Sequence, residues 1–199
     1  MTQKAYINQM LDRFGMAECK SVGAPAEGVL TRISAEKGGR PDKQYMSIVG
    51  SLLYAAMITR PDITYAVQAL GRHLQSSGEE HMIAAKRVLR YLQGTKDLGL
   101  VYEAKGDGAG QPSLVGFSDA DWGGDKDTRR STTGYLFMIE ESGGVISWGS
   151  KLQPTVALPV LSRGRVYGSV RRSTGSYSLK AFDAGLRIRT ERSNSNLRG

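Results

Sequence analysis

The stretch GFSDADWGGD, residues 116–125, decides how the second half of this chain is interpreted. The apolar run 114–118 leads into it, and three carboxylates, Asp119, Asp121 and Asp125, follow within seven residues. Carboxylates at the end of a buried strand can hold Mg²⁺ rigidly, and phosphodiester hydrolysis uses that ion to activate water and to neutralise the leaving oxyanion. The same spacing also fits a solvent-exposed turn whose Asp side chains hydrogen-bond to their own backbone.

The residues around the acidic turn exclude one alternative and leave others open. A calcium loop needs an acid or Asn at its fifth position and Glu at its twelfth, where this chain has Gly123 and Arg130. Trp122 and Trp148 have the chemistry to stack on bases, but among strand and turn residues we expect them to pack. The basic run of Lys126, Arg129 and Arg130 fits either a phosphate contact or an exposed turn.

Three strand-like runs surround this turn. They are residues 114–118, residues 133–139, rich in aromatic and β-branched side chains, and residues 145–152, which follow the turn signal Gly143-Gly144. Short links between neighbouring strands favour an antiparallel meander. Residues 98–103 form a further short strand candidate, and a Gly-rich loop follows them. We therefore place a domain boundary near residue 105.

The first 95 residues have the periodicity of helices. One expected helix carries Tyr6 to Phe14 and stops at Gly15, and a second begins at Asp42 as its N-cap. Arg60-Pro61 interrupts the pattern before a third helix, because Pro61 suits only a first helical turn. Residues 77–80 have the S-x-x-E form of a capping box and predict the start of a fourth helix, which Gly94 ends.

Composition limits the class of protein. Apolar residues make up 40% of the chain, which is enough for a core, and the longest apolar run, residues 48–58, is too short to span a bilayer. No signal peptide is recognisable, so we expect an intracellular protein without a membrane partner. We also expect no small-molecule cofactor. Cys19 is the only cysteine, which excludes an internal disulfide; with only His73 and His81 beside it a zinc cage is implausible. We expect both histidines at the surface.

The net charge of +8 is concentrated in the last 41 residues. Residues 159–199 hold nine Lys or Arg against Asp183 and Glu191, whereas residues 1–158 hold 18 basic and 17 acidic residues. Basicity of this kind normally indicates phosphate contacts. The tail also lacks a sustained period and is rich in Ser, Arg and Gly, so we expect it to be disordered.

The order of the segments is more specific than any single motif. Five stretches occur in succession: FGMAECKSVGAPAEG, SIVGSLLYAAMITRPDITYAVQALGRHLQ, EEHMIAAKRVLRYLQGTKDLGL, GFSDADWGGDKDTRRSTTGYLF and ISWGSKLQPTVAL. Together they resemble the C-terminal part of the Pol polyprotein of copia-type retrotransposons, over residues 1–158. In that family this region is the end of the reverse transcriptase, a helical thumb and connection, followed by the ribonuclease H domain.

The resemblance implies a fold, a site and a substrate. The expected fold is α/β (α+β), with a helical region at 1–104, a partial ribonuclease H-like domain with a three-stranded antiparallel meander at 105–158, and a basic tail at 159–199. The family's SDAD segment matches residues 118–121, which makes Asp119 the first catalytic, metal-binding carboxylate. Mg²⁺ is the implied metal and an RNA–DNA hybrid the implied partner. The polymerase palm, with its Tyr-x-Asp-Asp motif, would precede Met1, so the resemblance does not support DNA synthesis by this chain.

The family's next acid would lie in an E-A-E-Y-M segment on a helix soon after QPTVAL, where this chain has PVLSRGRVYG. Codons CGA GGC AGA GTA TAT GGN for residues 163–168, shifted by one base, read GAG GCA GAG TAT ATG, which is Glu-Ala-Glu-Tyr-Met. Given those family codons, residues 164–167 are each forced. We therefore hypothesise a frameshift between about Leu158 and Arg163, which makes the tail largely out-of-frame translation.

Three functions remain at this point. The first is an inactive fragment of reverse transcriptase and ribonuclease H. The second is a residual Mg²⁺-dependent ribonuclease H whose missing acids come from Asp183, Glu191 or another chain. The third is a non-catalytic nucleic-acid-binding module that uses the helices and the basic tail.

Overall fold

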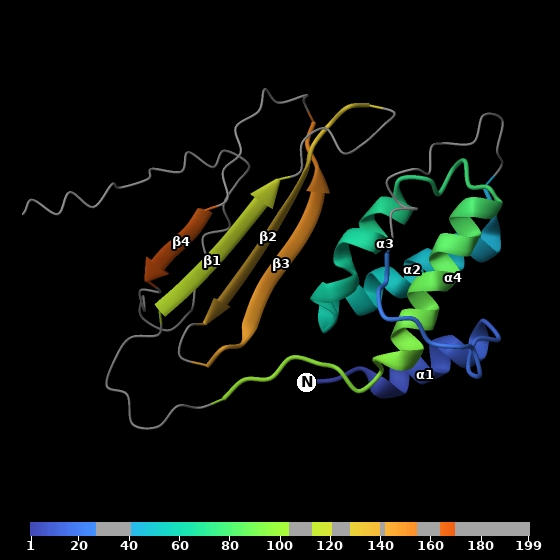
Figure 1. The fold of residues 1–199 in the computed structure, drawn as a ribbon, viewed down its shortest axis with the longest axis horizontal. Coiled ribbons are helices and arrows are strands. Elements are labelled where there is room, and N and C mark those ends of the chain that lie inside the picture. Colours follow the sequence, from blue (N-terminus) through green and yellow to red (C-terminus); the bar gives the residue numbers. More distant parts are fainter. Residues whose placement is uncertain (27–40, 104–112, 121–127, 140–141, 155–163, 170–199) are drawn as a thin grey trace, which may run out of the picture. The chain divides into compact units, whose positions relative to one another are not determined.

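A computed structural model describes residues 1–26, 41–103, 113–120, 128–139, 142–154 and 164–169, all within one compact unit, Met1–Ser169. Its helices are α1 (Lys4–Arg13), α2 (Lys43–Ile58), α3 (Thr64–Gly71) and α4 (Glu79–Gly94), with a 3₁₀ turn, η1 (Pro61–Ile63), before α3. Its strands are β1 (Ser113–Ala120), β2 (Thr132–Ile139), β3 (Val145–Leu152) and β4 (Gly164–Ser169) (Figure 1). No helix in these ranges is long and apolar enough to cross a membrane.

The helix boundaries follow local signals that the sequence carries. The Asp42 carboxylate accepts hydrogen bonds from the backbone N–H of Gln44 (2.7 Å) and Tyr45 (3.2 Å), which confirms it as the N-cap of α2. Gly15 follows α1 with a φ of +66°, a conformation that favours glycine. Pro61 begins η1 as expected, so the chain breaks between α2 and α3 where the sequence predicts.

The predicted capping box at Ser77 is wrong. The N-cap of α4 is Gly78, and its N–H donates to Nδ1 of His81 at 3.0 Å. His81 is 2% exposed and its ring lies 4.5 Å from that of His73, so the prediction of a surface position for His81 is also wrong. The S-x-x-E pattern predicted that the Glu80 carboxylate accepts a hydrogen bond from the N-cap backbone. In the structure the His81 imidazole, three residues after Gly78, is that acceptor.

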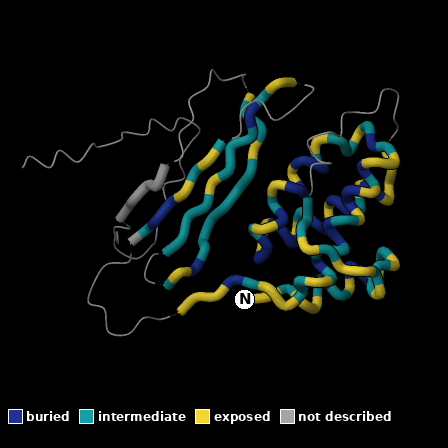
Figure 2. The backbone as a smooth tube through the Cα atoms, viewed as in Figure 1, coloured by how far each residue is buried: buried dark blue, intermediate teal, exposed yellow. Residues whose placement is uncertain are grey.

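The hydrophobic core lies among the helices. Its largest fully buried apolar side chains come from all four helices and η1, and Figure 2 shows the same concentration of buried residues there. Among the described residues of β1, β2 and β3, Val115 is the one buried apolar side chain. The sheet is therefore half-covered, as expected for strands that lack a full layer of helices.

A buried cation joins the break between α2 and α3 to the end of α4. Arg60 is 1% exposed, and its guanidinium donates to the Asp62 carboxylate (2.6–3.3 Å) and to the carbonyl and hydroxyl oxygens of Thr95 (2.9 and 2.7 Å). The Tyr91 hydroxyl donates to the same carboxylate at 2.9 Å. A buried charge is tolerated only when it is paired and hydrogen-bonded, and Arg60 has both forms of compensation.

The three expected strands form the predicted antiparallel meander, and β3 has the predicted bounds. The sheet contains a fourth strand that the sequence did not predict: β4 pairs antiparallel with β1, giving the order β3-β2-β1-β4. This strand lies within the segment expected to be part of a disordered tail. The candidate strand at 98–103 is wrong, because the only β-pairing of that segment with the described residues is an isolated bridge, Thr2 to Gly99. The domain boundary near residue 105 stays a prediction.

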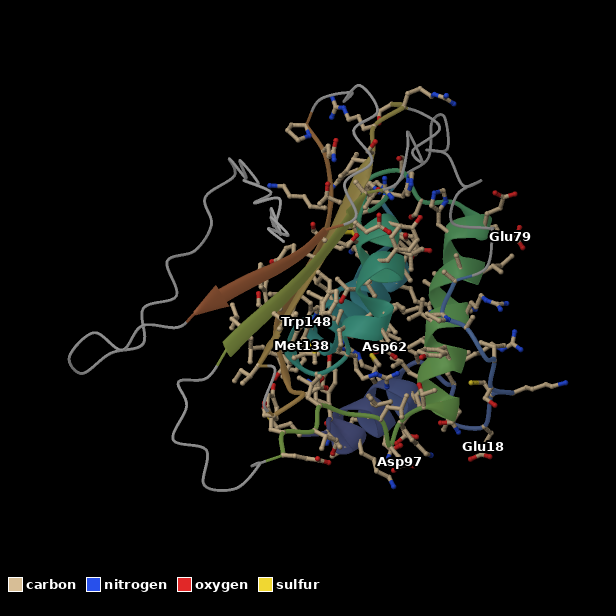
Figure 3. All side chains as sticks on the ribbon, turned by 60° about the vertical axis from the view of Figure 1, so that its left-hand side comes forward. Glu18, Asp62, Glu79, Asp97, Met138 and Trp148 are labelled. Atoms are coloured by element: carbon tan, nitrogen blue, oxygen red, sulfur yellow. The ribbon has the colours of Figure 1, made fainter. Side chains whose placement is uncertain are left out.

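Side-chain hydrogen bonds join β3 to α2 and to the segment that follows α4. The Trp148 indole Nε1–H donates to the carbonyl of Ala56 in α2 at 2.8 Å, which confirms the expected packing role of Trp148 (Figure 3). The Tyr102 hydroxyl donates to the carbonyl of Val145 at 2.6 Å. The Tyr102 ring lies against Gly144, where an added Cβ would clash with ring carbon Cδ1. Gly144 is thus required by the close approach of Tyr102 rather than by its backbone conformation.

Removal of the Arg60 partner should destabilise the helices. Asp62→Ala leaves a buried guanidinium without its counter-charge, and we expect the free energy of unfolding to fall by about 2–3 kcal/mol, less than for a fully buried pair because Asp62 is part-exposed. Urea unfolding followed by circular dichroism measures this change. Asp97→Ala is the matched control, since it breaks the exposed pair with Lys4 (2.6 Å), and it should leave the midpoint unchanged. Equal effects of the two substitutions would contradict the role of Arg60.

The pH dependence of stability should identify the same carboxylate. Burial alone would raise the pKa of Asp62. Hydrogen bonds from Arg60 and Tyr91 and the charge of Arg60 lower that pKa by more than burial raises it, so the pKa lies below its usual value. Its stabilising contribution is therefore present above the unfolded-state pKa, about 4, and is lost as the pH falls through the lower folded-state pKa. The difference in unfolding free energy between wild type and Asp62→Asn should be constant near neutrality and narrow below about pH 4. A difference that widens on acidification would contradict this assignment.

The Tyr102 contact can be tested with a double-mutant cycle. Gly144→Ala should displace the Tyr102 ring, break its hydrogen bond and lower the free energy of unfolding by about 1 kcal/mol. In a Tyr102→Ala background the same change should be nearly neutral. Gly50→Ala is a control in α2, where an added Cβ has no neighbour within 4 Å, and it should stabilise by about 0.5–1 kcal/mol. Additive effects of Gly144→Ala and Tyr102→Ala would contradict the proposed contact.

Candidate functional site

Asp119 lies at the C-terminal end of β1, one residue before the strand ends. Its side chain is exposed, and its Oδ1 accepts a hydrogen bond from the backbone N–H of Ala120 at 2.9 Å. In the sheet Asp119 pairs with Gly134 of β2, and Gly134 has no side chain that could cover the Asp119 carboxylate. The carboxylate is thus exposed at a position that pairs with β2, one residue beyond the end of the pairing between β1 and β4 at Ser118.

The register of the sheet places Asp119 on the face that meets the helices. Side chains alternate along a strand, and directly paired residues share a face. Gly134 pairs with Ser150 of β3, and Leu136 pairs with Trp148, whose indole reaches α2. Asp119, Ser150 and Trp148 therefore belong to the helix-facing side of the sheet.

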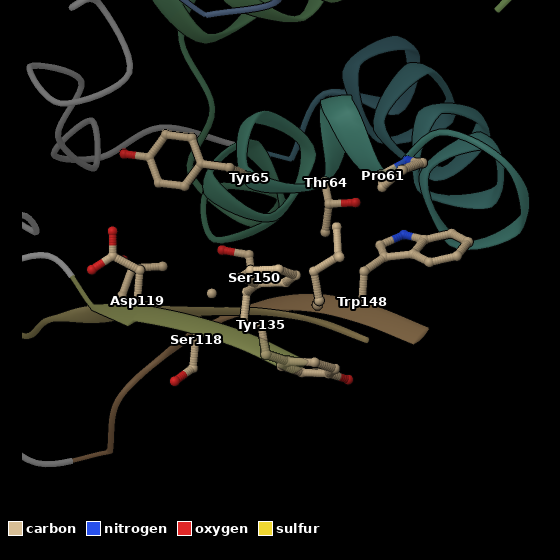
Figure 4. A pocket seen from close by; sticks show the side chains of 13 residues that line it. Pro61, Thr64, Tyr65, Ser118, Asp119, Tyr135, Trp148 and Ser150 are labelled. Carbon is tan, nitrogen blue, oxygen red and sulfur yellow. The ribbon is translucent and has the colours of Figure 1, made fainter. Parts of the chain in front are cut away.

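A cleft of about 670 Å³ separates this face from the start of α3. Its helical wall is made by Pro61, Thr64 and Tyr65, and its sheet wall includes Phe117, Asp119, Trp148 and Ser150. Figure 4 shows Tyr65 and Asp119 at one end of the cleft and Pro61 and Trp148 at the other. The end near Trp148 is joined to α2 by the Trp148–Ala56 hydrogen bond. Tyr65, Thr132 and Ser150 also line a second, smaller cavity.

Of the three acidic residues in the turn, the structure describes only Asp119. Asp121 and Asp125 lie outside the described residues, as do Trp122 and Lys126 and the tail acids Asp183 and Glu191. Within the described ranges no group of three or more His, Cys, Asp or Glu side chains is placed to hold a metal ion. The proposed magnesium site therefore rests on Asp119 and on the sequence around it.

The sequence did not indicate the helical wall of the cleft. Tyr65 lies on α3 and is 39% exposed, although the apolar period of that helix is made by its buried neighbours Ala66, Val67, Ala69 and Leu70. The one signal in the sequence was that Tyr65, an aromatic residue, lies outside the apolar face of a short helix. Arg129 and Arg130, which the sequence did single out, lie directly before β2 at the Asp119 end of the sheet.

Comparison with known proteins gives consistent relatives. The chain is 45% identical over 166 residues to the retrovirus-related Pol polyprotein from transposon TNT 1-94 of Nicotiana tabacum, a match that covers 79% of this chain and 12% of that protein. It is 42% identical over 158 residues to the Pol polyprotein from transposon RE1 of Arabidopsis thaliana, covering 78% of this chain and 10% of the relative. It is also 49% identical over 114 residues to secreted RxLR effector protein 161 of Plasmopara viticola, covering 57% and 76% of the two chains.

These matches define the family and its limits. No family model and no solved structure matches the chain. The chain spans only about a tenth of the length of the two Pol polyproteins. Several Pol polyproteins nevertheless match about four fifths of it at 40–45% identity. The chain belongs to the retrovirus-related Pol polyproteins of transposons, the family that its sequence resembles.

Proposed function

We propose that this chain is the region of Pol in which the reverse transcriptase ends and the ribonuclease H domain begins. In this proposal α1 to α4 are the thumb and connection, and β1 to β3 open the ribonuclease H-like sheet. The position of Asp119 is the observation that carries the proposal: an exposed carboxylate near the end of the inner strand β1, paired with β2 and beside a cleft. Such a position suits a metal ligand because the strand fixes the carboxylate while leaving it accessible.

Asp119 would be the first of several carboxylates that hold Mg²⁺ in a complete site. The ion, when bound, supplies an activated water and neutralises the leaving oxygen of a phosphodiester. The substrate would be the RNA strand of an RNA–DNA hybrid, recognised in part through its 2′-hydroxyl groups. Asp119 alone cannot supply the several fixed oxygen ligands that such a site needs.

We further propose that this chain does not cleave its family's substrate. The next catalytic acid is expected on a helix after Leu158, but residues 164–169 form β4, hydrogen-bonded along the edge of β1. Residues 164–168 of this strand belong to the segment 163–168, whose proposed codons give Glu-Ala-Glu-Tyr-Met when shifted by one base. A strand in place of the expected acid-bearing helix is consistent with a translated but out-of-frame segment.

A cleavage assay tests this proposal. The purified chain, incubated with Mg²⁺ and a hybrid carrying a labelled RNA strand, should show no more cleavage than its Asp119→Asn variant. A chain with the reading frame restored after Leu158 should cleave the RNA strand and lose that activity with Asp119→Asn. Asp97→Asn, a change at an exposed carboxylate of the helical region, is the matched control and should leave cleavage intact.

Two outcomes would contradict the proposal. Cleavage by the chain as it stands, abolished by Asp119→Asn, would show that the site is complete without the shifted segment. A restored-frame chain that folds, with cooperative thermal unfolding, but does not cleave would contradict the role assigned to Asp119.

A further inference from the structure

The outer side of α2 is apolar although it is exposed to solvent. After Lys43, its first residue, the helix has no charged side chain. Four of its large apolar side chains are exposed: Met46 (37%), Tyr54 (52%), Met57 (66%) and Ile58 (43%). A helix that is apolar on all sides is usually enclosed on all sides, and a contiguous exposed apolar patch marks an interaction surface. We call these four residues, together with Gly50, the α2 face.

The outer side of α4 shows what an ordinary solvated helix of this protein looks like. Ile83 is 59% exposed there, but charged residues of both signs, Glu80 and Lys86, are exposed on the same helix. A single exposed apolar side chain among charges is normal for a protein surface. The α2 face differs because it has several such side chains and no charge among them.

Gly50 lies at the centre of the α2 face. A Cβ added there would have no neighbouring heavy atom within 4 Å, so the helix surface is open at this point. Met46 lies four residues before Gly50 and Tyr54 four residues after it, so the helix carries a large side chain one turn away on either side. Such a surface, a gap between two ridges, is complementary to itself after a two-fold rotation. Glycine weakens a helix, and the close approach of a second helix would offset that cost.

Positive charge is confined to one end of the α2 face. Lys43 begins the helix, and Nη2 of Arg13 donates to the Ser47 hydroxyl at 3.0 Å near the same end. Parallel pairing of two α2 helices would bring these cations against their own copies. Antiparallel pairing about Gly50 instead brings Arg13 toward Tyr54 of the second copy, where a guanidinium can lie on an aromatic ring. The charges therefore favour an antiparallel pair.

We propose that the α2 face binds a second copy of this chain, with the two α2 helices antiparallel and crossing at Gly50. The helix has 16 residues and is about 24 Å long. A contact along one helix of this length covers less than the about 800 Å² per partner of a standard interface, so the dimer should be transient, with a dissociation constant in the micromolar range. This interface uses neither Asp119 nor the tail at 159–199, so it is independent of the proposed function.

Sedimentation velocity of the full chain, freed of nucleic acid and measured in EDTA, tests this inference. Wild type should pass from monomer to dimer between about 1 and 200 μM. Gly50→Glu brings two carboxylates together at the crossing and should raise the dissociation constant at least about tenfold. Gly71→Glu is the matched control, the same change at a glycine of α3 whose added Cβ also has no neighbour within 4 Å, and its dissociation constant should stay within about twofold of wild type. Circular dichroism should show the wild-type helix content in both variants.

Disulfide cross-linking gives a second measurement that fixes the arrangement. In a Cys19→Ser background, which removes the natural thiol, Gly50→Cys should form an interchain disulfide under mild oxidation, because the crossing brings the two copies of residue 50 together. Lys43→Cys should not, since the two copies of residue 43 would lie about 21 Å apart along antiparallel helices. Gly71→Cys, outside the α2 face, should stay monomeric as well.

Several results would overturn the inference. Wild type that stays monomeric throughout the concentration range would do so, and so would equal association of wild type and Gly50→Glu. Equal weakening by Gly50→Glu and Gly71→Glu would show that the effect is not local to the α2 face. Cross-linking through Lys43→Cys but not through Gly50→Cys would contradict the antiparallel crossing. Association that disappears when the salt concentration is raised to about 0.5 M would indicate contacts between charges, whereas an apolar interface should persist.

Discussion

The Arg60 guanidinium lies buried where α2 ends, and its hydrogen bonds to Asp62 and Thr95 set the path of the chain from that point. They hold η1 in place, and η1 fixes where α3 begins. Since Pro61, Thr64 and Tyr65 make the helical wall of the cleft, the shape of the candidate site depends on this ion pair as well as on the sheet. An apolar residue at position 60 would fill the space but would leave Asp62 and the end of α4 without the group that joins them.

The sheet depends on the helices for its order. Val115 is its one buried apolar residue among the described positions of β1 to β3, so its own core is small. The hydrogen bonds from Trp148 and Tyr102 anchor β3 and the preceding turn to the helical region. On the other edge, β4 supplies backbone partners to β1 that would otherwise face solvent. The strand that carries Asp119 is therefore central in the sheet, although the segment that makes it so is the one proposed to be out of frame.

The sequence predicted those features that depend on neighbouring residues. Asp42 was recognisable as an N-cap, Gly15 as a helix stop and Pro61 as a break, because each acts on the backbone of its own segment. The three strands of the meander were recognisable from their residue types and turn signals. Two predictions failed because a side chain or segment elsewhere decides the outcome. His81 replaced the expected capping Glu, and residues 98–103 form an isolated bridge to Thr2 instead of a strand. The helical wall of the site could not be predicted, because Tyr65 becomes part of it only through the packing of α3 on β3.

We propose a Pol region in which the first carboxylate of a nuclease site is in place and the segment with the next acid was lost from the reading frame. The nucleotide sequence of the locus across residues 158–168 tests this most directly. The account predicts CGA GGC AGA GTA TAT GGN for residues 163–168, with Glu-Ala-Glu-Tyr-Met in the frame shifted by one base. Any other codons there that do not restore this segment when shifted would contradict it.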